Sequence, residues 1–487
     1  MTESNKISQT SQFPLQGAEG VLYFLGIGGI GMSALARYFV SKGNKVSGYD
    51  KTATALTRQL ETEGIKIHYE DNVALIEKDA KIVVYTPAIP ASHTELNYYR
   101  DNNYRLMKRS EVLGLITQSN YNICVAGTHG KTTTSAMVAH ILRDSGYGGT
   151  AFLGGIATNY DTNFWSQLPT YSASSQKNIC VAEADEYDRS FLQLTPDIAI
   201  ITSMDADHLD IYGTAENMEQ AFIDFASQIK PGGCLILKHG LKRNADFKVA
   251  DICTYSITDN QANIHIINLT VKNGAYHFDV INNYWTVENV LLNMGGLHNI
   301  ENAIAAIGVA KYLKIDDDKI KSAVASFAGV KRRFEYIIRS NAPSPPGSRL
   351  LSGGEGPVFI DDYAHHPEEL RALINSAKEL FPDKKCTVVF QPHLYSRTKD
   401  LSDGFAEVLS LADETVLLPI YPARELPMPG VSSKLIADKI TISNKWIKEK
   451  DEVLQWVKEN KIELLITCGA GDIDTLIQPL KNIILNK

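Results

Sequence analysis

A phosphate-binding loop is the clearest chemical signal in this sequence. Residues 127–132 read Gly-Thr-His-Gly-Lys-Thr and directly follow an apolar stretch, 121–126. In such loops the backbone amides and the lysine ammonium bind phosphates, and the hydroxyl after the lysine binds Mg²⁺. The longer form of the motif has a glycine where this chain has Val125, so the loop is a shorter variant. The residues expected to contact phosphates are Gly127, Thr128, His129, Gly130, Lys131, Thr132 and Thr133.

Two polar segments that end later apolar stretches are candidates for a metal site. Glu183 ends one stretch and His208 follows the next. Neighbouring parallel strands end at the same edge of a sheet, so we expect both side chains beside the phosphate loop, where Glu183 binds Mg²⁺. For Asp185, Glu186 and Asp188 the alternative is a solvated acidic loop. A purely structural role is the alternative for His208.

A second glycine-rich loop, Gly26-Ile-Gly-Gly-Ile-Gly31, lies between an apolar stretch and a helical pattern. Its glycines allow the backbone to approach a pyrophosphate, and the helix N-terminus attracts negative charge. The pattern fits NAD, with Asp50 on a ribose hydroxyl, but any pyrophosphate-linked nucleotide, including a UDP-sugar, satisfies the same physics. A tight turn without a ligand is the remaining alternative.

Two clusters with histidines lie further along the chain, at 361–366 and 391–397. Arg397 is a candidate carboxylate ligand, because a guanidinium binds both oxygens at once. Surface ion pairing is the alternative for this arginine.

Secondary-structure elements must position these segments. Along the chain, apolar strands alternate with helical patterns, and this pattern restarts three times. This alternation predicts an α/β protein with parallel sheets. We expect a Rossmann-like N-terminal domain (1–118), a central domain resembling P-loop ATPases (119–329) and a Rossmann-like C-terminal domain (330–487). The expected strands are 21–25, 45–49, 121–126, 178–182, 197–202, 357–361, 386–390, 414–420 and 463–468, and the expected helices include 33–41, 299–313 and 368–380.

Two further segments have distinct patterns. Residues 263–291 are expected to be rich in strands, with a turn at Asn273-Gly274. The Pro/Gly/Ser-rich segment 340–356 is expected to be a flexible hairpin tip, because strand-like sequence flanks it on both sides.

Length and composition narrow the function. At about 150 residues per domain, 487 residues predict roughly three domains. The formal net charge of -8 argues against a nucleic-acid partner, which selects for a basic face. Six scattered cysteines fit reduced thiols in the cytoplasm. The polar first 20 residues do not resemble a signal peptide, and no apolar stretch predicts membrane insertion.

Together, these motifs resemble the Mur ligase family over nearly the whole chain, and within it the branch that adds alanine. The segments that carry the resemblance are 26–33, 127–133, 183–186, 207–210, 298–302, 332–335, 361–367 and 391–393. The resemblance implies an ATP-dependent ligase of peptidoglycan synthesis that joins the carboxylate of UDP-N-acetylmuramate to L-alanine. ATP would phosphorylate the carboxylate, alanine would attack the acyl phosphate, and ADP and phosphate would leave.

The resemblance also implies roles for individual residues in the first two domains. A UDP-sugar site would lie in the first domain, at Gly26, Gly28, Gly29, Ile30, Gly31 and Asp50. ATP and metals would bind the second domain, with Lys131, Glu183 and His208 as the catalytic residues. Thr132 and Glu183 would hold one Mg²⁺, and His208 a second.

The remaining family roles involve the end of the nucleotide and the amino acid. His298 and Asn302 would contact the adenine, while Arg333 and Asp362 would reach the phosphates and ribose from the third domain. The alanine end would be lined by Tyr363, His365, His393 and Arg397.

The sequence departs from the family pattern in two places. Several relatives carry a carbamylated lysine after the metal histidine, but residues 209–229 contain no lysine, as expected of the alanine-adding branch. Many alanine-adding members have an arginine where this chain has Leu394, which leaves Arg397 as the arginine of that segment.

Other functions account for less of the sequence. A nicotinamide dehydrogenase explains the first glycine loop alone, a P-loop motor explains the phosphate loop alone, and a non-catalytic nucleotide-binding regulator gives the remaining clusters no role. The nearest alternative is a recycling ligase that attaches a preformed peptide to the same sugar nucleotide.

Overall fold

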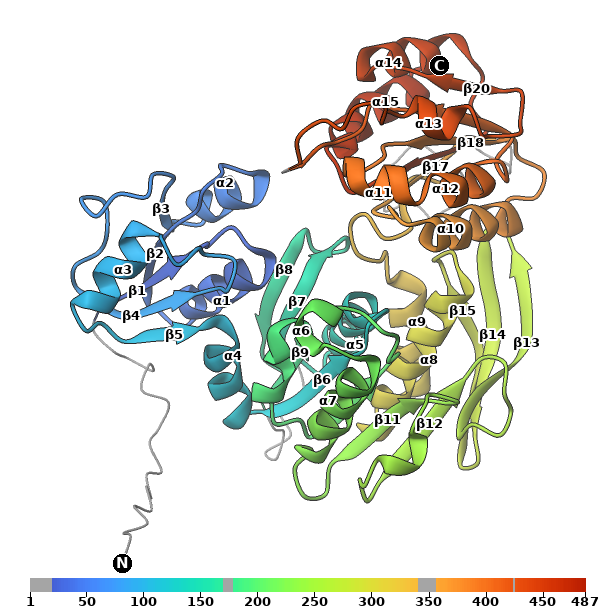
Figure 1. The fold of residues 1–487 in the computed structure, drawn as a ribbon. Helices are drawn as coiled ribbons and strands as arrows, with labels where there is room; N and C mark the ends of the chain where they lie inside the picture. The colour runs from blue at the N-terminus through green and yellow to red at the C-terminus, as the bar shows by residue number, and fades with distance from the viewer. Residues whose placement is uncertain (1–19, 170–177, 340–355, 424) are drawn as a thin grey trace, which may run out of the picture.

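The computed structural model describes residues 20–169, 178–339, 356–423 and 425–487, and every structural statement below concerns these residues. They form three β-sheets that follow one another along the chain, each flanked by helices (Figure 1). The prediction of an α/β protein with three sheet domains is thereby confirmed. The boundaries at residues 118 and 329 remain predictions.

The first sheet has the strand order β3-β2-β1-β4-β5, with all neighbours parallel. Its strands are β1 (Val21–Leu25), β2 (Lys45–Tyr49), β3 (Lys66–His68), β4 (Ala80–Tyr85) and β5 (Leu106–Lys108). Its helices are α1 (Ile30–Ser41), α2 (Ala55–Thr62), α3 (Thr94–Asp101) and α4 (Arg109–Gln118). β1 is buried along its whole length, as expected of a strand covered on both faces. The order reverses between β1 and β4, and ligands of such sheets bind outside the strand ends at this point.

The second sheet has the order β15-β14-β13-β12-β11-β10-β6-β9-β7-β8. Its strands are β6 (Tyr121–Ala126), β7 (Gly149–Ala157), β8 (Thr162–Gln167), β9 (Ile179–Glu183), β10 (Ile198–Ile201), β11 (Cys234–Lys238), β12 (Ile252–Ser256), β13 (Ile264–Lys272), β14 (Ala275–Asn282) and β15 (Trp285–Leu292). Its helices are α5 (Lys131–Asp144), η1 (Tyr187–Gln193), α6 (Leu209–Tyr212), α7 (Ala215–Ser227), η2 (Asn244–Asp246), α8 (Leu297–Tyr312) and α9 (Asp317–Ser326). The predicted turn at Asn273-Gly274 joins the antiparallel strands β13 and β14.

One expectation about this sheet is wrong. The strands that end at Glu183 and shortly before His208 were expected to be neighbours, but β6 lies between β9 and β10 and pairs with both. The reason is that the chain crosses over β6 after β9, so successive strands are added on opposite sides of the first. The ends of β9 and β10 therefore flank the phosphate loop from both sides.

The third sheet has the order β16-β17-β21-β18-β19-β20. Its strands are β16 (Glu335–Ile338), β17 (Val358–Asp362), β18 (Cys386–Phe390), β19 (Glu414–Leu417), β20 (Lys445–Ile447) and β21 (Leu464–Cys468). Its helices are α10 (Pro367–Leu380), α11 (Tyr395–Asp400), α12 (Ser402–Leu409), α13 (Lys434–Ala437), α14 (Lys450–Glu459), η3 (Ile473–Leu476) and α15 (Ile477–Leu485). β16 and β17 pair antiparallel, as a hairpin requires. The expected tip, 340–356, lies outside the described residues except for Gly356.

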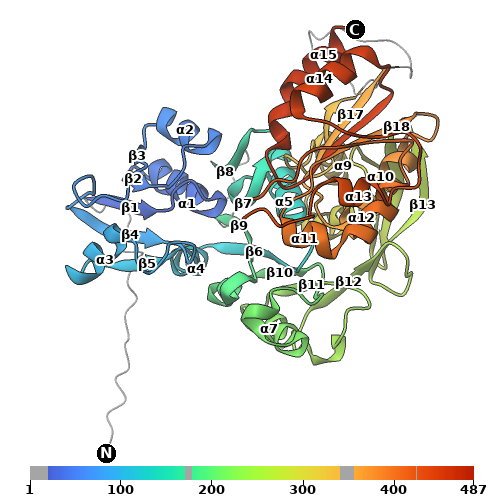
Figure 2. The same cartoon turned by 45° about the horizontal axis from the view of Figure 1, so that its top comes forward.

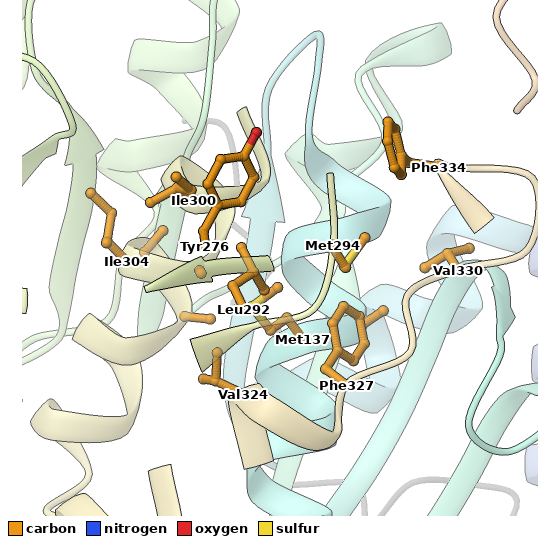
Figure 3. Close-up of a cluster of buried hydrophobic side chains, with 14 of the residues drawn as sticks. Met137, Tyr276, Leu292, Met294, Ile300, Ile304, Val324, Phe327, Val330 and Phe334 are labelled. Atoms are coloured by element: carbon orange, nitrogen blue, oxygen red, sulfur yellow. The ribbon is translucent and has the colours of Figure 1, made fainter. Parts of the chain in front are cut away.

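The central core extends to the segment that leads into the third domain (Figure 3). Met137 of α5 and Leu292 of β15 pack inside this core, and Phe334 joins the same cluster from the connecting segment. The Phe334 ring is 3% exposed and lies so close to Gly295 that a Cβ there would collide with it. Phe334 has a φ of 49°, a left-handed conformation that is costly for a bulky residue. Tight packing therefore fixes the connection between the two domains.

The first domain packs against the edge of the central sheet through α1. Figure 1 and Figure 2 both place this helix beside β7 and β8. Tyr38 lies 5.4 Å from Phe152 and 6.2 Å from Phe164, measured between ring centroids. Next to these rings, the buried Asn163 amide donates to Ile30 O at 2.5 Å and to Ser33 Oγ at 3.0 Å. The start of α1 is thus tied to the central domain.

Within the described ranges, no helix is both long and apolar enough to cross a membrane.

A buried carboxyl group lies in the first domain. Glu95 is inaccessible to solvent and accepts hydrogen bonds from Tyr23 OH at 2.7 Å and from Asn72 N at 3.0 Å. Tyr23 Oη is in turn 2.6 Å from His68 Nε2. Burial raises the pKa of Glu95 to about 7, although both hydrogen bonds lower it.

We predict that Glu95→Gln removes a pH-dependent loss of stability. The folded-state pKa of about 7 lies above the usual 4.5, so the folded protein binds this proton more tightly than the unfolded chain. The resulting stabilisation is complete below pH 4.5 and is lost as the pH rises through 7. A glutamine mimics the protonated acid, because its carbonyl accepts from Asn72 and its amide donates to Tyr23. Between pH 4.5 and 8 the unfolding free energy of the variant, relative to wild type, should rise by up to about 3 kcal/mol.

Urea unfolding of both proteins across this pH range measures the effect. Glu61→Gln, at an exposed position on α2, is the control and should follow the wild-type pH dependence. A difference between Glu95→Gln and wild type that is independent of pH would contradict the prediction.

Candidate active site

The phosphate loop connects the buried strand β6 to α5. Gly127 has a φ of 134° and Gly130 a φ of 84°, a range that favours glycine. Gly130 is the N-cap of α5 and, as a glycine, has no side chain to cap this helix. The amides of its first turn are therefore free to bind an anion, which the helix dipole favours.

Side chains from two other elements hold this loop closely. A Cβ on Gly130 would lie 2.7 Å from Asn302 Oδ1, and one on Gly127 would collide with the Thr202 hydroxyl. Ser203 Oγ accepts from the amide of His129 at 2.7 Å, so this amide already has a partner. Thr202 and Ser203 directly follow β10, and the sequence reasoning did not identify them. Two hydroxyl residues at the end of a buried strand were the available signal.

Lys131 forms a partly buried ion pair. Its Nζ lies 2.8 Å from Glu186 Oε1 and donates to Gly127 O at 2.7 Å. Glu186 is 2% exposed, so the alternative of a solvated acidic loop is wrong for this residue. Among the described residues its second oxygen, Oε2, is buried and has no hydrogen-bond partner. Its position three residues after the strand-end Glu183 is the sequence signal that could have identified it.

Glu183 lies beside the phosphate loop, as expected from its place at the end of β9. Its Oε1 accepts from the Thr132 hydroxyl at 3.1 Å, and its Oε2 accepts from Gly154 N at 3.0 Å. A Cβ on Gly154 would collide with this carboxylate. Burial raises the pKa of Glu183, while Lys131 and Thr132 lower it.

His208 lies on the opposite side of the loop. Its Nε2 is 4.0 Å from Glu186 Oε1 and 3.7 Å from Asp207 Oδ2. Its φ of 49° places it at the left-handed start of the short helix α6. The ring also packs edge-on against Tyr187, with centroids 5.3 Å apart.

This arrangement suits Mg²⁺ without forming a complete cage for it. Within the described part of the chain, no group of three or more His, Cys, Asp or Glu side chains is placed to hold a metal ion. Mg²⁺ usually binds one or two carboxylates and completes its shell with phosphate oxygens and water. The Thr132 and Glu183 oxygens and the unpaired Glu186 Oε2 fit that donor chemistry. The metal roles of Thr132, Glu183 and His208 remain predictions.

The two residues expected to contact the adenine differ in solvent exposure. His298 is exposed in the first turn of α8. Asn302 is buried, its Oδ1 accepts from the Thr134 hydroxyl at 3.0 Å, and its Nδ2 donates to Asn299 Oδ1 at 3.1 Å. Asn302 therefore supports the phosphate loop in this structure, and its contact with adenine stays a prediction.

The two residues expected to reach from the third domain also differ. Arg333 is exposed, and its charge lowers the pKa values of both Glu183 and Asp362, so its guanidinium acts on both groups. Asp362 accepts from Phe334 N at 2.6 Å and from Ala364 N at 2.7 Å. Burial raises its pKa to about 6 against these hydrogen bonds. Asp362 thus holds the connecting segment, and its contact with a nucleotide stays a prediction.

The residues expected at the alanine end lie together. His365 lies 5.3 Å from Tyr363 and 6.2 Å from His393, measured between ring centroids. Arg397 Nη1 is 3.5 Å from His393 Nδ1. Burial, and then the Arg397 charge, lower the pKa of His393. His393 also stacks on Tyr421, a neighbour that the sequence reasoning missed because it follows a different strand.

The glycine loop of the first domain contacts Asp50. The amide of Gly28 donates to Asp50 Oδ2 at 2.8 Å, and Thr52 N donates to Asp50 Oδ1 at 3.1 Å. Both carboxylate oxygens therefore already accept hydrogen bonds from the backbone. The N-cap of α1 is Gly29, which has no side chain to cap the helix, and its own amide donates to Gly26 O at 3.1 Å.

Arg109 lies between the glycine loop of the first domain and the acidic segment that follows β9. The sequence reasoning did not identify this residue. Its guanidinium lies 2.6 Å from the position of a Cβ on Gly31, and it pairs with Asp185 at 2.9 Å. A small cavity between the domains is lined in part by Arg109, Glu183, Asp185 and Ser190. A larger hollow of about 580 Å³ lies between β15, α8 and α9, away from these groups.

Three domain families match consecutive parts of this chain. The Mur ligase family catalytic domain matches residues 21–121, the Mur ligase middle domain matches 125–310, and the Mur ligase glutamate ligase domain matches 349–471. The chain belongs to the Mur ligase family. The predicted resemblance is thus confirmed.

Relatives and solved structures refine this placement. The chain is 47% identical over 469 residues to the UDP-N-acetylmuramate–L-alanine ligase of Parabacteroides distasonis, covering 95% of this chain and 97% of that relative. It is 45% identical to the enzyme of the same name from Cytophaga hutchinsonii, covering 94% and 96%. The crystal structure of UDP-N-acetylmuramate-alanine ligase MurC from Thermotoga maritima superposes with a TM-score of 0.77 at 27% identity, covering 96% and 99%. A murein peptide ligase from Psychrobacter arcticus, at 23% identity and a TM-score of 0.65, shares the fold.

We predict that Gly130→Ala destabilises the central domain more than Gly232→Ala does. The two glycines have φ values of 84° and 80°, so an alanine carries similar backbone strain at both. Gly232 has open space around a Cβ, whereas Gly130 faces Asn302. Gly232→Ala should cost about 1 kcal/mol of unfolding free energy. Gly130→Ala should cost at least about 1 kcal/mol more, because the Asn302–Thr134 hydrogen bond must break.

Urea unfolding of the two variants measures this difference. Both positions lie in the central domain, so the same transition reports on both. Equal losses would show that the contact with Asn302 has no energetic role.

Proposed function

We propose that this chain joins the carboxylate of UDP-N-acetylmuramate to the amino group of L-alanine and converts ATP to ADP and phosphate. The observation that carries the proposal is the phosphate loop with its Lys131–Glu186 and Thr132–Glu183 contacts, in a chain similar over nearly its full length to ligases of that name. The proposed partners are these small molecules, without nucleic acid or membrane insertion. We place the reaction in the cytoplasm, where ATP is available.

The reaction needs an activated carboxylate. A carboxylate is a poor electrophile, and transfer of the γ-phosphoryl group from ATP converts it into an acyl phosphate. The amine of alanine then attacks the carbonyl, a C–N bond forms, and phosphate leaves with the C–O electron pair. Lys131 would neutralise charge on the transferring phosphoryl group, which is most of what phosphoryl transfer requires. When bound at Thr132 and Glu183, Mg²⁺ would supply further neutralisation.

The first domain offers a site for the sugar nucleotide. The pyrophosphate would bind the amides of Ile30 and Gly31 at the start of α1, since the amide of Gly29 donates to Gly26 O at 3.1 Å. Asp50 holds the loop by accepting a hydrogen bond from the amide of Gly28. Its carboxylate oxygens would accept further hydrogen bonds from the ribose hydroxyls. The muramoyl carboxylate must then reach the phosphate loop. Arg109, which lies close to Gly31, and Glu183, which lies beside the phosphate loop, line one small cavity.

The third domain offers a site for the amino acid. Lowered pKa values favour neutral imidazoles at His365 and His393, so Arg397 is the cation of this group. A guanidinium binds a carboxylate through two parallel hydrogen bonds. Leu394 supplies no charge, and the backbone conformation there, with a φ of 70°, is anchored by its amide to Tyr421 O at 2.9 Å.

A recycling ligase that attaches a preformed peptide remains the second candidate. The likeness to the murein peptide ligase is at 23% identity and concerns the fold alone. The relatives at 44% to 47% identity carry the name of the alanine ligase. The alanine ligase is therefore the proposal that the observations favour.

ADP release tests the proposal directly. The purified protein is incubated with MgCl₂, ATP and UDP-N-acetylmuramate, together with L-alanine, glycine, L-serine or a tripeptide. L-Alanine should give the highest kcat/KM, and preference for the tripeptide would favour the recycling ligase.

Lys131→Ala should abolish turnover and leave UDP-N-acetylmuramate binding nearly unchanged, because the first domain is untouched. Turnover within about tenfold of wild type would contradict the role of Lys131.

Hydroxylamine tests the intermediate. With ATP and UDP-N-acetylmuramate but no alanine, it should trap the acyl phosphate as a hydroxamate. Normal turnover with no trapped product would indicate a concerted route.

We predict that Arg397→Ala selectively weakens alanine binding. Loss of a charged hydrogen-bond partner should raise the KM for alanine on the order of tenfold to a hundredfold. Arg397→Lys should recover part of this loss, because an ammonium lacks the planar two-pronged contact. The KM values for ATP and UDP-N-acetylmuramate should change little.

The matched control is Arg371→Ala, which removes an arginine of α10 that pairs with Glu407 and Glu368. It should leave all three KM values near those of wild type. An unchanged alanine KM in Arg397→Ala would show that Arg397 has a structural role only.

A further inference from the structure

Glu186 occupies an unusual place beside the phosphate loop. Its carboxylate is almost fully buried and lies 2.8 Å from Nζ of Lys131, the group that must contact the phosphates. Oε2 has no hydrogen-bond partner among the residues of the described ranges. A buried oxygen without a partner is costly and calls for an explanation, such as an ion or a ligand.

The backbone around Glu186 is fixed by several contacts. The Tyr212 hydroxyl donates to Glu186 O at 2.6 Å, and the preceding residue, Asp185, pairs with Arg109. Asp188 and Arg189 follow with φ values of 53° and 54°, which are unfavourable for side-chain-bearing residues. Strained backbone persists only where its surroundings hold it. Glu186 therefore cannot readily move away when phosphates approach Lys131.

This rigidity has an electrostatic consequence. The phosphates of ATP bring several negative charges to Lys131, where Glu186 already supplies one at contact distance. Glu183 adds a second carboxylate on the other side of the loop, at the Thr132 hydroxyl. In a buried site such like charges repel strongly. A divalent cation that enters with the nucleotide would remove this repulsion and give Glu186 Oε2 a partner.

We propose that Glu186 is a positioning residue that makes nucleotide binding depend on a divalent cation: it orients Lys131, and its fixed charge excludes metal-free ATP. The inference rests on the proposed function in that it takes ATP as the nucleotide. It assigns the discrimination between metal-bound and metal-free ATP to a residue outside the expected metal ligands.

The test is the ratio of two dissociation constants, measured by calorimetric titration without the other substrates. ATP is titrated into the full chain once with EDTA and once with MgCl₂. In Glu186→Gln, metal-free ATP should bind on the order of tenfold to a hundredfold more tightly than in wild type, and the ratio of the two Kd values should fall accordingly. Glu186→Asp keeps the charge and should keep the ratio within about threefold of wild type.

A matched control lies on the same segment. Asp188→Asn also removes one negative charge, from a half-exposed side chain 3.5 Å from Lys108. It should leave the ratio within about threefold of wild type, which separates the contact at Lys131 from a general change in charge.

The outcomes are distinct. An unchanged ratio in folded Glu186→Gln, or an equal change in Asp188→Asn, would overturn the inference. If Glu186→Gln does not fold, Lys131→Met is compared with Lys131→Met/Glu186→Gln, which removes the buried pair together. A fall in the ratio on the order of tenfold to a hundredfold is expected there as well, and its absence would again overturn the inference. Failure of wild type to bind ATP with MgCl₂ would instead contradict the proposed function.

Discussion

The phosphate loop depends on close packing by elements distant in sequence. Two of its glycines have conformations that other residues adopt at a cost, and each faces a side chain at a distance that leaves no room for a Cβ. Asn302 comes from α8 and Thr202 from the end of β10, so three elements must meet before the loop takes its shape. The backbone amides at the start of α5 can bind phosphate because this packing holds them in place.

The same constraint explains how the three domains share one site. Arg109 of the first domain pairs with Asp185, which lies next to the residue that contacts Lys131. On the other side, Asp362 of the third domain holds the amide of Phe334. The first contact lies one residue from Glu186, and the second fixes the residue after Arg333, whose charge lowers the pKa of Glu183.

Local sequence patterns were enough to predict most of the fold. Continuous apolar runs identified β6 and β18, and eight of the nine predicted strands agree with the structure within one residue at each end, because such strands are buried on both faces. Strands such as β4, β7, β8 and β11 were not predicted. The order of β9, β6 and β10 was not predictable from spacing, since it depends on which side of β6 the chain crosses. The domain boundaries remain untested.

The site was predicted less completely than the fold. Glycine spacing and Lys131 identify the loop, and the end of a strand identifies Glu183. Glu186 looked like a surface acid, because its burial depends on packing against residues elsewhere in the chain. The family resemblance pointed to Asn302 and Asp362, whose roles stay predictions. Their hydrogen bonds to Thr134 and Phe334 could not be predicted, since these partners become neighbours only after folding.

The aromatic contact between α1 and the β7–β8 hairpin bears on how the protein is made. Tyr38 belongs to a domain that leaves the ribosome before the central sheet does, whereas Phe152 and Phe164 are translated later. Until then the nascent first domain exposes the apolar face that will later cover the central sheet. Domains generally fold in the order of synthesis, and exposed apolar surface promotes aggregation. The apolar face of this domain is therefore covered only after the hairpin has been translated, and until then it is surface that aggregation or a chaperone can engage.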